Sequence, residues 1–449
     1  MISKEIIIII IIISNNEIIL MEYKKMELKN KDEDTDFNLI FSKENVNMGH
    51  QPEIDYHKAL LIILMIHDHV YYHYSLGSFY FYKIMEFFIF VFGAGGFMFL
   101  MGIGMKYTRH HEPKHFIERG IVLLTLSQLF NLIRDSIPNL IAWWVSGNKI
   151  FISRALLVLQ VDILSFSGLA FLFLALMKKM KLSDNFIFII GITMNMGAFF
   201  ANKIMKSPNC FLLSQFLGYF ILTDAESYFP LFSYFIFVAC GYWLGGIYQK
   251  IANKEKFYNL ILIFCLPILT IYYIFRKYYN FPMFPEYFSD KHYSLYPCPD
   301  AIGCCMTNLT SIAIFYKIHM ILKGKTPEFI IHVGKNLNEY YIISYVLTLH
   351  LKNILISIKG EEYPSQMEYP VIFSIVIFIS CRILIDINNK YIHFTITNLK
   401  YPMRNLIFTL IWITTFICVI YIYPKIEFYS TIWNNYLKNN ANINSKSGV

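Results

Sequence analysis

The sequence predicts an all-α fold, a polytopic bundle of about eleven transmembrane helices, with a range of ten to twelve. Of the 449 residues, 56% are hydrophobic and only 16% are charged, whereas average soluble domains carry roughly a quarter charged residues. The apolar residues fall in blocks of about 20, the length that crosses a hydrocarbon core about 30 Å thick. Basic loops separate alternate blocks, which is typical of the positive-inside bias of membrane proteins.

The predicted spans follow one another along most of the chain. Alternate loops are rich in Lys and Arg, beginning with "KYTRHHEPKHFIER" at 106–119, and the acidic residues gather in the other loops. This alternation predicts that the N-terminus and the basic loops face the cytoplasm and that the C-terminus lies outside. The predicted spans are 57–75, 84–106, 117–137, 155–177, 186–204, 229–249, 257–276, 301–322, 339–358, 369–388 and 403–424.

The chain divides into three parts by composition. Residues 1–52 are predicted to form a low-complexity, disordered tail. The run "EIIIIIIII" is too short to span a bilayer, and the polar stretch after it has no apolar face to bury. Residues 53–425 form the transmembrane domain, and 426–449 form a polar C-terminal tail. The net charge of +8 is explained by the basic loops, so we expect membrane lipids as partners and no nucleic acid.

Most of the eight cysteines lie inside predicted spans, where a thiol behaves as a small hydrophobic group. "CPDAIGCC" places Cys298, Cys304 and Cys305 near the outer surface, where a disulfide is an alternative to buried thiols. Neither a C-x-x-C motif nor a Cys/His ligand spacing occurs in the sequence, so we predict no metal site.

The first span, within "IDYHKALLIILMIHDHVYYHY" at 54–74, carries ionisable residues into the membrane. Such residues cost a few kcal/mol in hydrocarbon and are by default a functional hypothesis. On a helix, His69 and His73 lie one turn apart on one face, and Asp55 lies within about 40° of that stripe but roughly 20 Å away. His67 points nearly opposite. A neutral His bonded to a neighbouring helix is the structural alternative, but the shared stripe favours a polar face that serves function.

The second span is rich in glycine and leads into a basic loop. "FGAGGFMFLMGIGMKYTR" predicts close helix packing, because glycines let two backbones approach each other. Beyond it lie Arg109, Lys114 and Arg119. These cations suit a ligand with phosphate groups, since a guanidinium binds phosphate oxygens through two parallel hydrogen bonds. An ordinary positive-inside loop explains them equally well, and both interpretations stay open.

At these residues the sequence resembles membrane acyltransferases of the acyltransferase-3 and heparan-α-glucosaminide N-acetyltransferase type, in particular their bacterial members. That family opens with an Asp, an Arg three residues on, an apolar run, and a His fourteen residues after the Asp. Asp55, "LLIILM" and His69 fit this pattern, and Lys58 stands in place of the Arg. "FMFLMGIGMKYTR" and "VGKNLNEYYIISYVL" are similar to further family phrases, and the likeness covers roughly residues 53–425.

The resemblance implies an enzyme of a bacterial plasma membrane. It would transfer an acetyl or other acyl group from acetyl-CoA, or another acyl-CoA, to a hydroxyl or amine of an envelope sugar or lipid-linked glycan. His69 would be catalytic, as a general base or as a transient acyl carrier, with Asp55 of the same motif as the second catalytic residue. The donor phosphates would bind to basic residues of the cytoplasmic side: Lys58, Arg109, Lys114 and Arg119.

Two other functional classes also fit parts of the sequence. A transporter or flippase of lipid-linked sugars or small solutes would use intramembrane His, Asp and Arg, but it would commonly show internal repeats, and the sequence shows none. A non-catalytic scaffold would have no need of His69.

Overall fold

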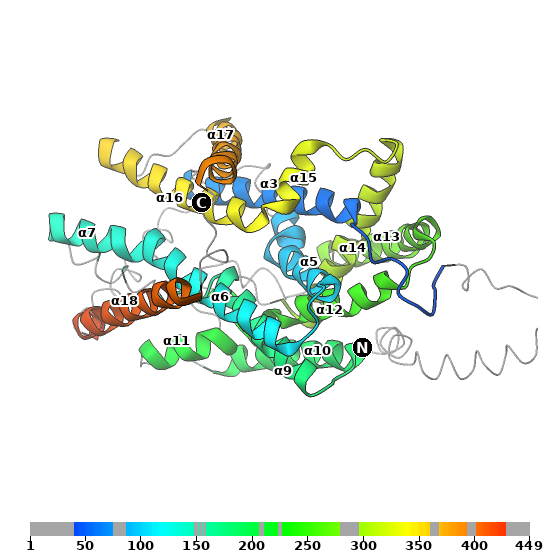
Figure 1. Cartoon of the computed structure of the whole chain (residues 1–449), viewed down its shortest axis with the longest axis horizontal. Coiled ribbons are helices and arrows are strands. Elements are labelled where there is room, and N and C mark those ends of the chain that lie inside the picture. Colours follow the sequence, from blue (N-terminus) through cyan, green and yellow to red (C-terminus); the bar gives the residue numbers. More distant parts are fainter. Residues whose placement is uncertain are drawn as a thin grey trace, which may run out of the picture.

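In the computed structural model the chain forms a bundle of helices (Figure 1). The structure describes residues 40–74, 87–147, 151, 155, 159–205, 211–222, 227–278, 296–359, 368–392 and 401–427. The helices are α3 (Pro52–Tyr74), α5 (Ala94–Tyr107), α6 (Pro113–Asn131), η1 (Leu132–Ser136), α7 (Ile137–Ser146), α9 (Ile163–Lys179), α10 (Asp184–Ile204), α11 (Phe211–Phe220), α12 (Leu231–Gln249), α13 (Lys254–Tyr278), α14 (Cys298–Ile321), α15 (Glu328–Lys335), α16 (Leu337–Lys359), α17 (Glu368–Ile387), η3 (Asn388–Ile392) and α18 (Tyr401–Glu427).

The prediction of an all-α multi-pass membrane protein is confirmed. Among the described residues, 8 helical segments are long and apolar enough to cross a bilayer. They match predicted spans, and the three remaining predictions, 57–75, 155–177 and 339–358, correspond to α3, α9 and α16. The apolar segments are Phe87–Tyr107, Pro113–Val145, Asp184–Ile204, Leu231–Gln249, Lys254–Phe275, Cys298–Ile321, Pro370–Tyr391 and Met403–Ile420.

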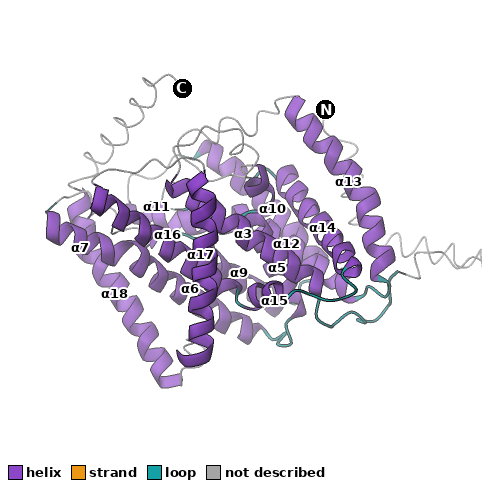
Figure 2. Ribbon diagram, turned by 90° about the horizontal axis from the view of Figure 1, so that it is seen from above, coloured by secondary structure: helices purple, strands orange, loops and turns teal. Residues whose placement is uncertain are grey.

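The bundle encloses α3 and leaves two apolar helices, α13 and α18, largely exposed at its edges. α3, which carries the ionisable residues, packs against α5, α14, α15, α16 and α17. By contrast, only 17% of the span in α13 and 11% of the span in α18 is buried, and both helices lie at the ends of the bundle (Figure 2). Their exposed side chains include Ile263 and Phe416. The neighbours of α3 therefore take the place of lipid around its charges, and the outer helices meet the lipid.

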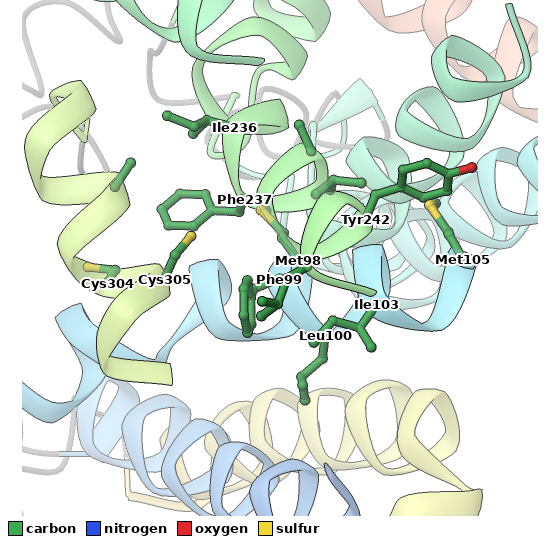
Figure 3. Packing of buried hydrophobic residues seen from close by; sticks show 14 of the residues in the cluster. Met98, Phe99, Leu100, Ile103, Met105, Ile236, Phe237, Tyr242, Cys304 and Cys305 are labelled. Atoms are coloured by element: carbon green, nitrogen blue, oxygen red, sulfur yellow. The ribbon is translucent and has the colours of Figure 1, made fainter. Parts of the chain in front are cut away.

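The tightest helix pair is α5 with α12, at the centre of the main hydrophobic cluster (Figure 3). A Cβ atom at Gly102 would overlap the carbonyl oxygen of Val238, and one at Gly241 would overlap that of Phe99. Both positions therefore require glycine, which confirms the close packing predicted for the second span. Gly104 of the same helix faces open space and has no such role. In Figure 3, Cys304 and Cys305 of α14 lie near Phe237 at the edge of this contact, and neither forms a disulfide.

The second span is interrupted at Gly93, between helical residues 87–92 and α5. The interruption frees backbone carbonyl groups inside the bundle, and side chains from the region of α14 bind them. The Tyr296 hydroxyl donates to the Phe90 carbonyl at 2.9 Å, and the Asn308 amide donates to the Val91 carbonyl at 3.0 Å. These bonds satisfy groups that would be costly to leave unpaired in a membrane.

Two boundaries differ from the sequence prediction. α9 begins at Ile163 rather than at 155, because Asp162 caps it by accepting a hydrogen bond from the Ser165 amide at 2.8 Å. The span predicted at 117–137 continues as one helical segment from Pro113 to Val145, through the π-helical turn η1. This turn places Arg134 and Asp135 inside the bundle.

Residues 40–51, assigned to the tail by composition, pack on the domain. The Phe41 backbone pairs with that of Ile251, and the Asn47 amide donates to the Gln249 carbonyl at 2.9 Å. The Tyr107 hydroxyl donates to the Asn47 carbonyl at 2.9 Å. This segment therefore ties together the end of α5, the end of α12 and the start of α13 next to the first turn of α3.

Candidate functional site

The polar stripe predicted on α3 faces α15 and α16. A Cβ atom at Gly334 of α15 would lie 2.7 Å from a carboxylate oxygen of Asp55, so these two residues are in contact. The ring of His69 lies 4.4 Å from the ring of Tyr345 of α16, edge to face. His67 instead points to α17, where its Nδ1 lies 3.1 Å from the Ser374 hydroxyl. The prediction that His67 and His69 point to different sides is confirmed; the His73 side chain lies outside the described residues.

Behind Tyr345 lies a buried arginine that the sequence analysis did not select. The Arg134 guanidinium lies over the Tyr345 ring, 5.0 Å from its centroid, and over the Phe130 ring at 4.8 Å. It donates to Asp135 at 2.5 Å and also to the Gln160 side-chain oxygen. The Arg134 side chain is only 3% exposed. The turn that holds it is π-helical, a distortion that is frequent at functional sites.

A second carboxylate balances the same arginine. Asp162, 2% exposed, accepts hydrogen bonds from the Ser165 amide and from the Ser127 hydroxyl at 2.7 Å, and it lies close enough to Arg134 to attract it. We call Arg134, Asp135, Gln160, Asp162 and Tyr345 the Arg134 cluster. It brings together η1, the N-terminus of α9 and α16, and it borders on His69 of α3. It is a buried network in which Arg134 is paired and hydrogen-bonded, while Asp162 accepts both of its hydrogen bonds on Oδ1 and its buried Oδ2 accepts none among the described residues.

Asp55 and Lys58 lie in the first two turns of α3, at the other end of the bundle. We call this end the basic end, because the loop of residues 108–112 lies there too. Asp55 is 5% exposed and is bonded by the Lys58 ammonium at 3.0 Å and by the His50 ring at 2.6 Å. The structure therefore pairs Asp55 with Lys58. It does not bring Asp55 to His69, which lies roughly 20 Å further along the helix.

Arg109, Lys114 and Arg119, predicted to bind donor phosphates, lie on the surface of the basic end. Arg109 is in the loop after α5, and the other two are in the first turns of α6. All three side chains are exposed, and within the described residues they form no ion pair. They are free to meet a ligand, but the structure does not gather them around one point.

The cations that the structure does gather are Lys106 at the end of α5 and Lys178 at the end of α9. The Lys106 ammonium pairs with Asp184 at 2.5 Å and lies 4.8 Å from the centroid of the Tyr242 ring. The Lys178 ammonium donates to the Tyr242 hydroxyl at 3.3 Å. Partial burial lowers the pKa of His111 in the adjoining loop, and the nearby charges of Lys178 and Lys106 lower it further. We call Lys106, Lys178, Asp184, Tyr242 and His111 the Lys106 cluster.

Sequence reasoning also missed His57, which is fully buried. Its ring nitrogens bond the Asn308 side-chain oxygen at 2.8 Å and the Ser311 hydroxyl at 3.1 Å. Because Asn308 binds the Val91 carbonyl, this contact links α3 to the break at Gly93. A signal was present, since His57 is an ionisable residue at the start of the first predicted span, but only the structure shows its partners on α14.

These features define a multi-pass membrane protein built around a polar central helix, with a histidine beside a buried ion cluster at one end and cations near water at the other. The chain belongs to the heparan-alpha-glucosaminide N-acetyltransferase family, whose catalytic model matches residues 51–275, half of the chain. By family it is therefore a membrane acetyltransferase. Searches of curated proteins and of solved structures give no match. The likeness to the acyltransferase-3 type and the bacterial source stay predictions.

The matched residues include both ends of the candidate site. They contain α3 with Asp55, Lys58 and His69, the basic loop, the Lys106 cluster and Arg134 with its two carboxylates. α14 to α18 lie beyond residue 275, so Tyr345 is contributed by the part of the chain outside the match. Among the described residues, no group of three or more His, Cys, Asp or Glu side chains is placed to hold a metal ion.

Proposed function

We propose that this protein moves an acetyl group from cytoplasmic acetyl-CoA, or a related acyl-CoA, to an amine or hydroxyl of an envelope sugar or lipid-linked glycan. The observation that carries the proposal is His69, which lies within the family's matched region, inside a polar helix, on the face that contacts Tyr345. In this proposal the membrane is a bacterial plasma membrane and the N-terminus lies in the cytoplasm.

His69 acts in the proposal on the acetyl group or on the acceptor. As a general base it takes the proton of the acceptor amine or hydroxyl while that atom attacks the acetyl carbonyl and the thiolate leaves. As an acyl carrier its ring nitrogen first attacks the acetyl carbon and the CoA thiolate leaves; the acceptor then attacks the same carbon, the imidazole leaves, and its freed nitrogen takes the acceptor's proton. Both routes need the imidazole held in one orientation, and the edge-to-face contact with Tyr345 restricts it.

The Arg134 cluster serves in the proposal as the support for His69. Arg134 is held by Asp135, Gln160 and two aromatic faces, so its charge is fixed behind Tyr345. A fixed positive charge near a reacting carbonyl favours the negative charge that develops on its oxygen, and it does so more strongly where water is excluded. We therefore assign Arg134 a positioning and electrostatic role in acetyl transfer.

The basic end serves in the proposal as the donor side. Lys58, Arg109, Lys114 and Arg119 attract the phosphate groups of the acyl-CoA, because they are cations at the end of the bundle where α3 begins. Asp55 acts there by holding Lys58 and His50, since its carboxylate is bonded to both and lies far from His69. The transporter hypothesis explains the intramembrane charges, but it does not explain membership in an acetyltransferase family.

Transfer of labelled acetyl tests the proposal directly. Purified protein in detergent or vesicles is incubated with acetyl-labelled acetyl-CoA and glucosamine, with an N-acetylated sugar as the control acceptor whose amine is blocked. We expect label in the sugar and release of one free CoA thiol for each acetyl moved. Unchanged acetyl-CoA, together with passage of a labelled sugar lipid across the vesicle membrane, would contradict the enzyme and support a transporter.

A further inference from the structure

The Lys106 cluster lies where five elements of the basic end meet. Lys106 comes from the end of α5, Lys178 from the last turn of α9, Asp184 from the first turn of α10, and Tyr242 from α12. Phe116 of α6 completes the group, with its ring 5.1 Å from the Lys178 ammonium. Residues from so many elements converge only when the fold holds them in place, so this is a built site rather than a chance surface patch.

Two consecutive glycines of α12 make room for the charged groups. A Cβ atom at Gly245 would lie 2.8 Å from the Cβ atom of Lys106. A Cβ atom at Gly246 would lie 2.7 Å from a carboxylate oxygen of Asp184 and 3.3 Å from Cε of Lys106. The Lys106 chain therefore lies flat along α12, and its ammonium is directed to Asp184 and Tyr242 rather than into water.

The charges in the cluster do not balance. Asp184 pairs with Lys106, whereas Lys178 forms no ion pair in the described part of the chain. The Lys178 ammonium instead contacts neutral groups, the Tyr242 hydroxyl and the faces of Phe116 and Tyr242. Burial lowers the pKa of Lys178, and the charge of Lys106 lowers it further, while Asp184 opposes both. A partly buried cation next to another cation is stabilised when an anion binds between them.

We propose that Lys178 and Lys106, with Asp184 and Tyr242 as their support, bind a phosphate group of the donor nucleotide. This inference rests on the proposed function, because it assigns the anion to acyl-CoA. The surface cations Arg109, Lys114 and Arg119 then attract the donor from a distance, and the Lys106 cluster fixes one of its phosphates. Lys178 provides an ammonium that donates to Tyr242 and has no carboxylate partner among the described residues, and Lys106 provides a second ammonium whose direction is set by Asp184.

The test compares Lys178→Ala with Lys179→Ala, which removes the same charge from the next residue. Lys179 is exposed and lies outside the cluster, so it is a matched control. We expect Lys178→Ala to raise the KM for acetyl-CoA roughly ten- to a hundredfold with little change in kcat, because charge-assisted phosphate contacts are strong. Lys179→Ala should change the KM less than about twofold. Equal effects of both variants would overturn the site.

Protection by inorganic pyrophosphate gives a readout that does not depend on activity. Pyrophosphate should raise the melting temperature of the wild-type protein and of Lys179→Ala, but not that of Lys178→Ala. Lys178→Arg, which keeps the charge, should recover the protection and so excludes a folding defect. If pyrophosphate protects through Lys178 but wild-type protein transfers no acetyl, the proposed function fails while the anion site stands. If pyrophosphate protects Lys178→Ala as well as it protects Lys179→Ala, the anion site itself is overturned.

An anionic lipid headgroup has the same phosphate chemistry, so vesicles of two compositions separate the sources. In vesicles of phosphatidylcholine alone, the KM difference between wild-type protein and Lys178→Ala should remain. If the difference appears only when phosphatidylglycerol is present, the cluster binds a lipid headgroup, and its assignment to the donor is wrong.

Discussion

The two ends of the bundle are both polar, but they differ in how their charges are compensated. In the Arg134 cluster, an arginine 3% exposed is bonded to a carboxylate and an amide and covered by two aromatic rings. At the basic end, Lys178 contacts the Tyr242 hydroxyl and the Phe116 ring and forms no ion pair with any residue that the structure describes, and Arg109 and Arg119 are exposed. The first region is closed by its own partners, whereas the second leaves cations for something else to pair with.

This difference separates positioning from binding. Buried charges that are paired and hydrogen-bonded, such as Arg134, hold their geometry and are costly to disturb, so they suit the support of a reacting group. Partly exposed cations lose little when they change partners and are screened by salt, so they suit a ligand that arrives and leaves. α3 connects the two regions, with Lys58 at one end and His69 near the other.

The largest expected effect is an all-or-none difference in labelling that fixes which region faces the cytoplasm. A cysteine at Lys181, in the basic turn after α9, should react with a membrane-impermeant thiol reagent only from the inside, because the positive-inside bias places that turn there. A cysteine at Asn280, in the predicted outer loop outside the described residues, should react only from the outside. Protein without the added cysteine gives the background, and the reverse labelling would contradict the proposed side of the donor.

The next largest effect is expected at His69. His69→Ala should lower the rate of acetyl transfer by about 10²–10⁴-fold if it removes a general base, and by more if it removes an acyl carrier. His69→Asn keeps some hydrogen bonding but no basic nitrogen and should be nearly as inactive. His67→Ala, whose partner Ser374 lies on α17, is the matched control and should lose much less activity. Near-normal transfer by well-folded His69→Asn protein would remove His69 from the mechanism.

Arg134 should matter to stability as well as to rate. Arg134→Met leaves Asp135 and Gln160 without their partner inside the bundle, and breaking a buried ion pair from one side costs about 3–5 kcal/mol. We expect a marked fall in melting temperature in detergent. Arg119→Met removes an exposed arginine from α6, earlier in the same helical segment, and should change the free energy of unfolding by less than about 0.5 kcal/mol. Equal melting temperatures for both variants would show that the two regions do not differ as described.

The smallest effect is expected at the surface of the basic end. Arg119→Ala should raise the KM for acyl-CoA about tenfold at low salt, equivalent to about 1.4 kcal/mol, and leave the KM for the acceptor unchanged. Because the side chain is exposed, the difference should disappear near 1 M salt, where the screening length is about 3 Å. A donor KM that is the same in both proteins at low salt would leave Arg119 with a role in membrane orientation only.

The fold was predictable to the extent that it depends on local pattern. Apolar block length predicted a helix at each of the eleven blocks, and 8 helical segments of the described residues are long and apolar enough to cross a bilayer. The pattern could not place the start of α9, because the cap by Asp162 depends on a single side chain, or the continuation of α6 through η1. It also could not show that residues 40–51 pack on α12 and α13, since those contacts join positions about 200 residues apart.

The candidate site was predictable only along one helix. Helical periodicity placed Asp55 and His69 on one face and His67 on another, and the structure agrees. Periodicity does not report what a neighbouring helix contributes, so Tyr345 and Arg134 were missed beside His69. For the same reason Lys106 and Lys178, which are far apart in sequence, were counted as loop charges although the fold brings them to one tyrosine ring.

The break at Gly93 has a consequence for how the protein is made. The Val91 carbonyl is capped by Asn308, which follows it by 217 residues in the chain. At roughly 5–20 residues per second, a ribosome needs on the order of 10–40 s to synthesise that interval. Residues 87–92 of the second span therefore enter the bilayer long before Asn308 has been synthesised. Lipid cannot supply the hydrogen-bond donor that the Val91 carbonyl lacks during this time. Biogenesis must keep this segment next to the insertion machinery, or in a provisional continuous helix, until α14 emerges.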